Sequence, residues 1–137
     1  MKNKLINKIS NNQLSVGVIG LGYVGLELLL NIARKKIRTY GFDIDPVKIK
    51  KIKQQKSFIN YISDEDLKIL KNTCTISSQY SEIRKCDVII LCLPTPLNKY
   101  REPDISAIKK TIDKISKFLK INQLLVLEST TYPGTTE

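Results

Sequence analysis

A glycine-rich hexapeptide, GLGYVG at residues 20–25, constrains the fold of this chain more than any other feature. It directly follows a short apolar run and directly precedes a leucine-rich stretch with helical spacing. At such a strand-to-helix junction Gly20 permits the tight turn, Gly22 leaves room for a phosphate to approach the backbone, and Gly25 allows close helix–strand packing. The pattern predicts a dinucleotide-binding turn, with a purely structural glycine turn as the alternative.

Short apolar strands alternate with longer helical segments, which is typical of a parallel sheet with crossover helices. The predicted strands are residues 15–20, 37–43, 74–77, 87–93 and 124–128. The predicted helices are residues 24–36, a segment starting at Pro46, a segment capped by Ser63 and Asp66, and residues 105–119 with Asp104 as the N-cap. The run DVIILCL at 87–93 is continuously apolar, so we expect both of its faces to be covered. The fold class is therefore α/β, a Rossmann-type doubly wound, mostly parallel sheet.

The domain organisation is simple. Residues 1–14 are a polar N-terminal extension, and residues 15–137 form one cofactor-binding domain. Residues 135–137 resemble the start of a helix. Because five strands are found where six are usual, we expect the chain to be the N-terminal part of a longer protein. No stretch has the length of a membrane span or the pattern of a secretory signal, which predicts a cytoplasmic protein.

Composition excludes several kinds of site. The chain has no histidine, which removes Ser-His-Asp and Cys-His catalysis and histidine zinc sites. Its three cysteines lack C-x-x-C spacing, so neither a disulfide framework nor any metal site is indicated. The net charge of +10 is compatible with nucleic-acid binding. However, 19 of the 23 basic residues are lysine, and many alternate with apolar helix positions, as in Lys109, Lys110, Lys114 and Lys117. We interpret these as a solvated helix face and regard nucleic acid as an improbable partner.

An acidic residue ends the second predicted strand. Asp43 lies 18 residues beyond Gly25, where a carboxylate accepts hydrogen bonds from adenosine ribose hydroxyls and repels a 2′-phosphate. This favours NAD over NADP. Asp45 is a competing candidate, but its place before Pro46 indicates a helix cap. Lys48 is either close to the ribose or simply solvated.

Two further polar segments follow the fourth and fifth predicted strands. They are LPTPL at 93–97 and ESTTYPG at 128–134. Ligands of open α/β sheets bind at the carboxyl ends of the strands, so the hydroxyls of Thr95, Ser129 and Thr130 should border the cofactor. The alternative is two proline turns whose Ser and Thr hydroxyls bind their own backbone. Cys92 precedes the first segment, but it lies in an apolar strand without a visible activating base.

Four ordered motifs together carry a family resemblance. VGVIGLGYVGLELLL, GFDIDPVKI, VIILCLPTPLNKYREPDISAI and LVLESTTYPGTTE resemble the N-terminal NAD-binding domain of the UDP-glucose/GDP-mannose dehydrogenase family. The second half most resembles members that oxidise UDP-N-acetylhexosamines, in particular UDP-N-acetylglucosamine 6-dehydrogenases. The resemblance implies oxidation of the sugar C6 from alcohol to carboxylate, with two NAD molecules reduced in sequence.

The resemblance also implies roles for individual residues. The glycine loop would hold the pyrophosphate, two residues would flank the adenosine ribose, and the strand ends would line the nicotinamide side. The pyrophosphate residues would be Gly20, Gly22, Tyr23, Val24 and Gly25, and the ribose residues Asp43 and Lys48. The residues on the nicotinamide side would be Leu93, Thr95, Pro96, Ser129 and Thr130. Thr130 is similar to a threonine that positions water in the hydrolytic half of the reaction. Arg101 and Glu102 lie near the substrate in this comparison, without an assigned role.

The family's nucleophilic cysteine and its catalytic lysine, asparagine and glutamate match no position of this sequence. A covalent thioester route needs a thiolate beside the position of hydride transfer. We therefore expect the chain to bind NAD without converting a UDP-sugar, and the parent enzyme to be a homo-oligomer. Two alternatives remain: the cofactor domain of a β-hydroxyacid dehydrogenase, and a basic NAD-responsive module that binds nucleic acid.

Overall fold

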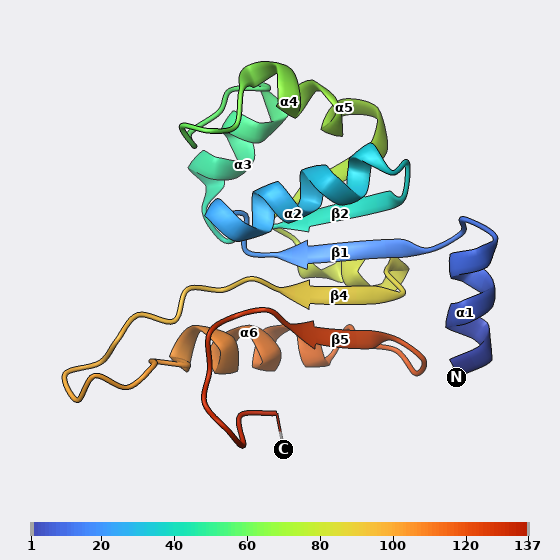
Figure 1. Ribbon diagram of the computed structural model, residues 1–137. Helices are drawn as coiled ribbons and strands as arrows, with labels where there is room; N and C mark the ends of the chain where they lie inside the picture. The colour runs from blue at the N-terminus through green and yellow to red at the C-terminus, as the bar shows by residue number, and fades with distance from the viewer. Residues whose placement is uncertain (1, 137) are drawn as a thin grey trace.

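Five parallel strands form one sheet in the order β3-β2-β1-β4-β5 in the computed structural model, which describes residues 2–136 (Figure 1). The strands are β1 (Ser15–Ile19), β2 (Arg38–Phe42), β3 (Cys74–Ser77), β4 (Val88–Leu91) and β5 (Leu124–Leu127). The chain runs from β1 outward to β3, then returns to place β4 on the other side of β1. This reversal is the switch point of a doubly wound sheet and confirms the expected fold class.

Helices cover the two faces of this sheet. They are α2 (Tyr23–Arg34), α3 (Pro46–Lys53), α4 (Asp64–Lys68), α5 (Leu70–Thr73), the 3₁₀ helix η1 (Tyr80–Lys85) and α6 (Ser106–Ser116). The first helix, α1 (Lys2–Ser10), lies instead at the amino ends of the strands (Figure 1). On one face Leu26, Leu29 and Leu30 of α2 are fully buried in a core shared with α3, α4 and α5. On the other face Ile108 and Ile115 of α6 are buried with residues of η1, β2 and β4.

Side-chain caps start two of the helices as the sequence predicts. Asp45 caps α3 by accepting hydrogen bonds from the Val47 N–H (2.8 Å) and the Lys48 N–H (3.4 Å). Ser63 and Asp66 form a reciprocal capping box at α4. These short polar residues bind backbone N–H groups that a helix cannot satisfy internally.

The prediction for α6 is wrong at both ends. The N-cap is Ile105 rather than Asp104, and the helix stops at Ser116, before Leu119. Asp104 still accepts a hydrogen bond from the Ser106 N–H (2.9 Å), so it closes a turn before the helix. Likewise, residues 135–136 form a turn instead of a helix start, and residue 137 lies outside the described residues.

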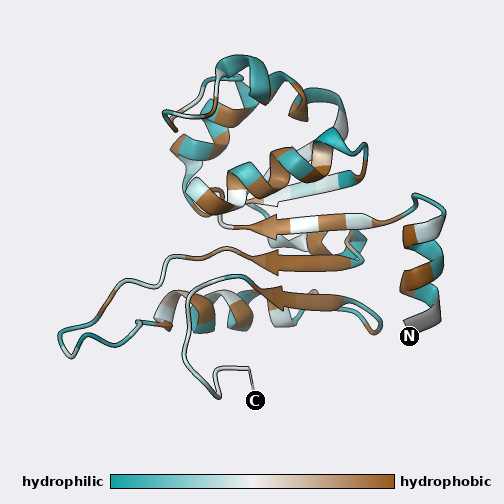
Figure 2. Ribbon diagram, in the orientation of Figure 1, coloured by the Kyte–Doolittle hydropathy of each residue, from teal (hydrophilic) through white to brown (hydrophobic). Residues whose placement is uncertain are grey.

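The expectation that β4 is covered on both faces is also wrong. Ile89 and Leu91 are buried against the α6 side, but Val88 and Ile90, which point to the α2 side, are only half-buried. Figure 2 shows β4 and β5 apolar along their whole length. The neighbour of β4 on one side is β5, the edge strand of the sheet, in which Leu124 and Leu125 remain exposed. The apolar run therefore belongs to an interior strand, paired with β1 and β5, that has a close helical cover on one face only.

The polar extension contains a helix that the sequence analysis did not predict. Lys8 of α1 forms an ion pair with Asp87, just before β4. The same carboxylate accepts hydrogen bonds from the Ser15 N–H (3.1 Å) and the Ser15 hydroxyl (2.9 Å). Asp87 thus ties the extension to the starts of two neighbouring strands. Among residues 2–136, none of the helices has the length and apolar character to span a bilayer.

Asp87→Asn is expected to reduce the free energy of unfolding by about 1–3 kcal/mol at pH 7, because a charged acceptor is lost. Burial raises the pKa of Asp87, but hydrogen bonds from Lys8 and Ser15 outweigh it and hold the pKa below its ordinary 3.8. A lowered pKa stabilises the folded state above the unfolded value, and this is lost as pH falls through the folded value. Urea unfolding should therefore show the wild-type advantage shrinking below pH 3.8.

Lys8→Met is the matched control, since it removes the ion pair and leaves both Ser15 hydrogen bonds. It should lose less stability than Asp87→Asn. Equal stability of Asp87→Asn and wild type at pH 7 would contradict this account.

Candidate functional site

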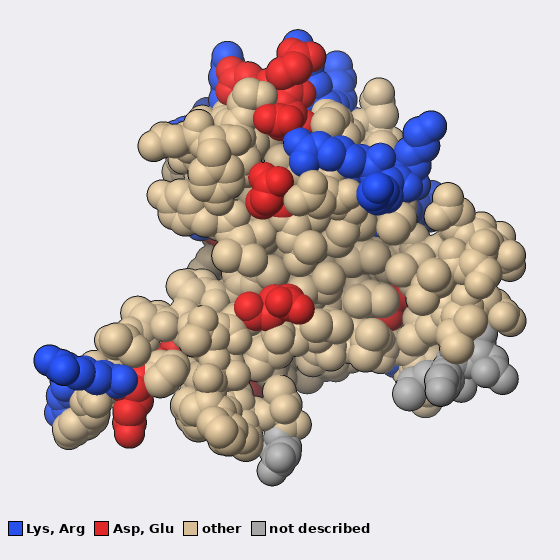
Figure 3. All heavy atoms as spheres, viewed as in Figure 1, with Lys and Arg blue, Asp and Glu red and all other residues tan. Residues whose placement is uncertain are grey.

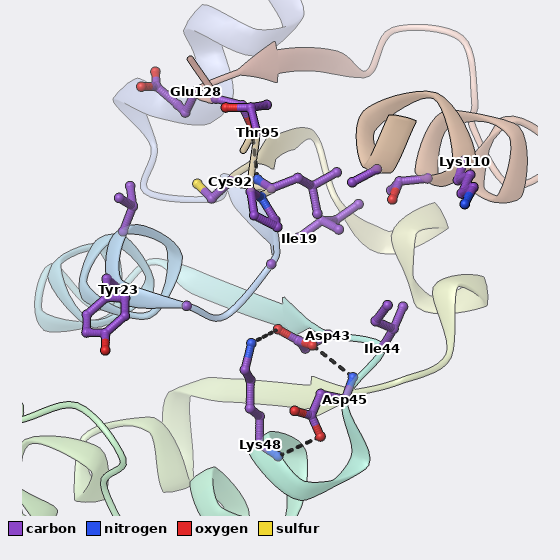
Figure 4. A pocket seen from close by; sticks show the side chains of 18 of the residues that line it. Ile19, Tyr23, Asp43, Ile44, Asp45, Lys48, Cys92, Thr95, Lys110 and Glu128 are labelled. Carbon is purple, nitrogen blue, oxygen red and sulfur yellow. Dashed lines mark hydrogen bonds and ion pairs between the residues drawn. The ribbon is translucent and has the colours of Figure 1, made fainter. Parts of the chain in front are cut away.

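A cavity of about 970 Å³ opens at the carboxyl ends of the strands, at the switch point between β1 and β4. Its walls come from the glycine loop, the β2–α3 turn, the ends of β4 and β5, and one face of α6 (Figure 4). Of the residues expected at a cofactor site, ten line it: Gly20, Gly22, Tyr23, Val24, Asp43, Lys48, Leu93, Thr95, Ser129 and Thr130. Residues from four separate segments of the sequence therefore meet in one concave site.

The three glycines of the loop have the three expected geometries. Gly20 has φ +93°, a conformation that disfavours any side chain. A Cβ placed on Gly25 would lie 1.8 Å from the Gly20 carbonyl oxygen, so only glycine permits this approach of α2 to β1. A Cβ on Gly22 would meet no heavy atom within 4 Å. Gly22 thus borders open space in the cavity, whereas Gly25 is a packing residue and does not line it.

Asp43 connects the glycine loop to the next turn. Its side chain is almost completely buried, at 7% exposure. One carboxylate oxygen accepts from the Leu21 N–H (2.8 Å) and the other from the Asp45 N–H (2.8 Å). The Lys48 ammonium lies 3.6 Å from the first of these oxygens (Figure 4). Each oxygen keeps acceptor capacity, because a carboxylate oxygen has two lone pairs.

The ends of β4 and β5 are joined by Ser129. Its hydroxyl accepts a hydrogen bond from the Leu93 N–H (3.0 Å) and lies 3.5 Å from the Leu91 carbonyl. Ser129 therefore binds backbone groups of the neighbouring strand end rather than those of its own turn, and it also lines the cavity. Thr95 and Thr130 line the same end of the cavity. Cys92 and Glu128 lie beside Thr95 in Figure 4.

The thiols of the chain are not activated. Burial, with the charge of Glu128 adding to it, raises the pKa of Cys92 to about 11. Burial also raises the pKa of Cys74 to about 11 and of Cys86 to about 12. At neutral pH such thiols stay protonated and are poor nucleophiles.

Besides Gly25, three expected residues lie away from the cavity lining: Pro96, Arg101 and Glu102. Pro96 is followed by a loop that closes on itself through a bridge between Leu97 and Pro103. In this loop the Glu102 carboxylate accepts from the Asn98 side chain (3.2 Å), and Arg101 has φ +62°. The loop projects far from the sheet (Figure 1), so Arg101 and Glu102 do not contribute to the cavity described here.

Several lining residues were missed by the sequence analysis. Phe58 and Ile59 come from the α3–α4 loop, Tyr80 from η1, and Ser106, Ala107, Lys110, Thr111 and Lys114 from α6. Burial, together with the charge of Asp43, raises the pKa of Tyr80. The spacing of the α6 residues, one helical turn apart, was the available signal, but the lysines among them were interpreted as solvated.

On one face of the molecule the basic side chains do not form one continuous surface (Figure 3). On the face drawn in Figure 3, basic side chains gather over the upper helices and at the tip of the long loop, with acidic side chains beside them in both places. Within the described chain Lys56 pairs with Asp64, and Lys68 with Glu65. This distribution does not support a broad nucleic-acid surface on that face.

The cavity suits an elongated ligand with phosphate groups in its middle. The N–H groups at the start of α2 precede the first intrahelical bond, which Leu26 donates to the Gly22 carbonyl (3.0 Å). They provide donors and the positive end of a helix dipole for phosphate. Asp43 provides an acceptor for hydroxyl groups on one side, and Thr95 and Thr130 provide hydroxyls on the other. These residues fit a dinucleotide.

Comparison with known proteins identifies the same kind of domain. The sequence model described as "UDP-glucose/GDP-mannose dehydrogenase family, NAD binding domain" matches residues 14–137. UDP-N-acetyl-D-glucosamine 6-dehydrogenase of Pseudomonas aeruginosa is 36% identical over 90% of this chain and 29% of that protein. UDP-N-acetyl-D-mannosamine dehydrogenase of Methanococcus aeolicus is 32% identical over 99% of this chain and 30% of that protein.

Solved structures of dehydrogenases of the same family have the same fold as this chain. The UDP-N-acetyl-mannosamine dehydrogenase Cap5O of Staphylococcus aureus superposes with a TM-score of 0.82 at 30% identity, over 90% of this chain and 30% of that one. The chain thus spans under a third of the length of these relatives.

Alanine at two glycines should separate ligand access from packing. Gly22→Ala should fold normally, because its Cβ meets no atom, but should weaken NAD binding about tenfold or more by occupying the phosphate space. Gly25→Ala should cost about 1–3 kcal/mol of stability, or more, because its Cβ overlaps a carbonyl oxygen. Thermal melting and calorimetric NAD titration distinguish the two. Unchanged NAD affinity in folded Gly22→Ala would refute the assignment of the phosphate position.

Proposed function

The chain belongs to the UDP-glucose/GDP-mannose dehydrogenase family as its NAD-binding domain, and from this premise we propose that it supplies the cofactor site of a UDP-sugar 6-dehydrogenase. One observation carries the proposal. The open side of Gly22, the start of α2 and the Asp43 carboxylate border one cavity, in the order that a dinucleotide requires. The family membership replaces the β-hydroxyacid dehydrogenase alternative.

The glycine loop and Asp43 bind and orient the cofactor in this proposal. The N–H groups of Tyr23 and Val24 donate to the pyrophosphate, and Gly22 gives it room to approach. Asp43 accepts hydrogen bonds from the ribose hydroxyls with its remaining lone pairs. The Lys48 ammonium lies 3.6 Å from the Asp43 carboxylate and so flanks the same ribose position. A 2′-phosphate would meet a buried carboxylate, so NAD is preferred to NADP.

The ends of β4 and β5 border the reacting half of the cofactor. NAD, when bound, accepts the hydride removed from the sugar C6. Leu93 and Thr95 line that end of the cavity, and Ser129 keeps the two strand ends together through the Leu93 N–H. Thr130, the next residue, lines the cavity and offers its hydroxyl to position water for the hydrolytic half of the reaction. Pro96 acts only by shaping the loop.

The proposed substrate is UDP-N-acetylglucosamine, oxidised at C6 from alcohol to carboxylate with two NAD molecules. The support is the similarity to the Pseudomonas aeruginosa enzyme named for this sugar. The Methanococcus aeolicus relative is named for UDP-N-acetyl-D-mannosamine, so both names fall in the UDP-N-acetylhexosamine class. The thioester route to the carboxylate requires an activated thiolate, and the three described thiols have raised pKa values. We therefore propose that this chain binds NAD and does not itself turn over the sugar.

Calorimetric titration should give one NAD site per chain and much weaker binding of NADP. Asp43→Asn should weaken NAD about tenfold or more, since a hydrogen bond to a charged group contributes about 1.5–3 kcal/mol. It should also reduce the preference over NADP. Lys48→Met is the control: it leaves the Asp43 carboxylate in place, so it should weaken NAD binding less than Asp43→Asn does. Absence of NAD binding by the folded wild-type chain would refute the proposed function.

A second measurement tests turnover. The chain mixed with NAD and UDP-N-acetylglucosamine should not oxidise the sugar through to the carboxylate, measured as two NADH per sugar at 340 nm, because no thiol near the cavity is ionised at neutral pH to form the thioester. UDP-N-acetylmannosamine and UDP-glucose should behave in the same way. A sustained rise that Cys92→Ser abolishes would contradict the proposal and make Cys92 a nucleophile.

A further inference from the structure

A contact from outside the glycine loop holds the first turn of α2. Tyr61, in the loop between α3 and α4, donates a hydrogen bond from its hydroxyl to the Tyr23 carbonyl oxygen (2.9 Å). The two rings lie with centroids 6.3 Å apart and an interplanar angle of 35°. Tyr61 is 61% exposed and Tyr23 is 68% exposed, so neither ring fills the core. Figure 1 shows this loop at the same end of the molecule as the start of α2.

The Tyr23 carbonyl shares a planar peptide unit with the Val24 N–H. In a helix the carbonyl of each unit points toward the C-terminus and the N–H points toward the N-terminus. The Val24 N–H therefore points out of the start of α2, beside the cavity that Val24 lines. A hydrogen bond accepted by the carbonyl fixes the plane of this unit and polarises its N–H, which strengthens that N–H as a donor.

The loop that carries Tyr61 is itself braced. The Asp64 carboxylate accepts from the Ser57 N–H (2.7 Å) and pairs with Lys56 (2.8 Å). The Ser57 hydroxyl accepts from the Ile59 N–H (3.1 Å). Ile62, the residue after Tyr61, is buried in the core. These contacts fix the position of Tyr61 beside the first turn of α2.

We propose that Tyr61 is a positioning residue for the pyrophosphate of NAD. It acts through the Tyr23–Val24 peptide unit, orienting and strengthening the Val24 N–H as a phosphate donor, and it touches no reacting atom. The inference rests on the proposed binding of NAD at the glycine loop. It adds a residue from a distant segment that neither the glycine pattern nor the cavity lining contains.

Tyr61→Phe in the 137-residue chain tests the proposal, because it removes the hydroxyl and keeps the ring beside Tyr23. The Kd values for NAD and ADP should rise about two- to fivefold, the effect of one partly exposed hydrogen bond. The Kd for adenosine should stay unchanged, since adenosine lacks the pyrophosphate. In ligand-free protein, the Val24 amide proton should shift upfield in a ¹⁵N–¹H NMR spectrum. Tyr100→Phe is the matched control, at a tyrosine 70% exposed and outside the cavity lining.

The possible outcomes are distinct. Unchanged NAD and ADP affinity in Tyr61→Phe would overturn this proposal alone, with the proposed function intact. An equal loss for adenosine would also overturn it, because the tyrosine would then shape the whole cavity. Failure of the wild-type chain to bind NAD would overturn both proposals.

Discussion

The close approach of α2 to the end of β1 is the constraint on which the site depends. The Gly25 α-carbon packs so near the Gly20 carbonyl that a methyl group would lie 1.8 Å from its oxygen. This packing places the start of α2 at the carboxyl end of the central strand, with its unpaired N–H groups beside the cavity. The same approach explains why Gly20 adopts positive φ, since the chain must turn at once from strand to helix.

Asp43 extends this constraint to the next strand. The buried Asp43 carboxylate accepts hydrogen bonds from the Leu21 N–H in the glycine loop and the Asp45 N–H before α3. It thereby connects the end of β2 to the glycine loop and to the start of α3. Asp45 in turn caps α3, and Lys48 in its first turn lies near Asp43. The residue proposed to select the cofactor is therefore also one that builds the loop, which would link binding at this site to stability.

Sequence reasoning found the residues whose roles are local. The turn at the glycine loop, the caps at Asp45 and at Ser63, and the place of Asp43 directly after the second strand follow from backbone geometry within a few residues, and the structure shows each of these features. It was wrong about Asp104 as an N-cap and about a second cover for β4. Both errors concern tertiary packing, since the start of α6 and the cover of β4 depend on neighbouring elements.

The sequence by itself determined the βαβ unit, the parallel sheet and the segments that end at its carboxyl edge. These follow from hydrophobic periodicity, glycine conformation and the alternation of strands and helices. Only the tertiary structure decided that Lys110 and Lys114 face the cavity, that Lys8 holds the first helix against Asp87, and that Tyr61 reaches Tyr23. Each is a contact between segments distant in sequence, and no local pattern encodes such a contact because the intervening fold sets the distance.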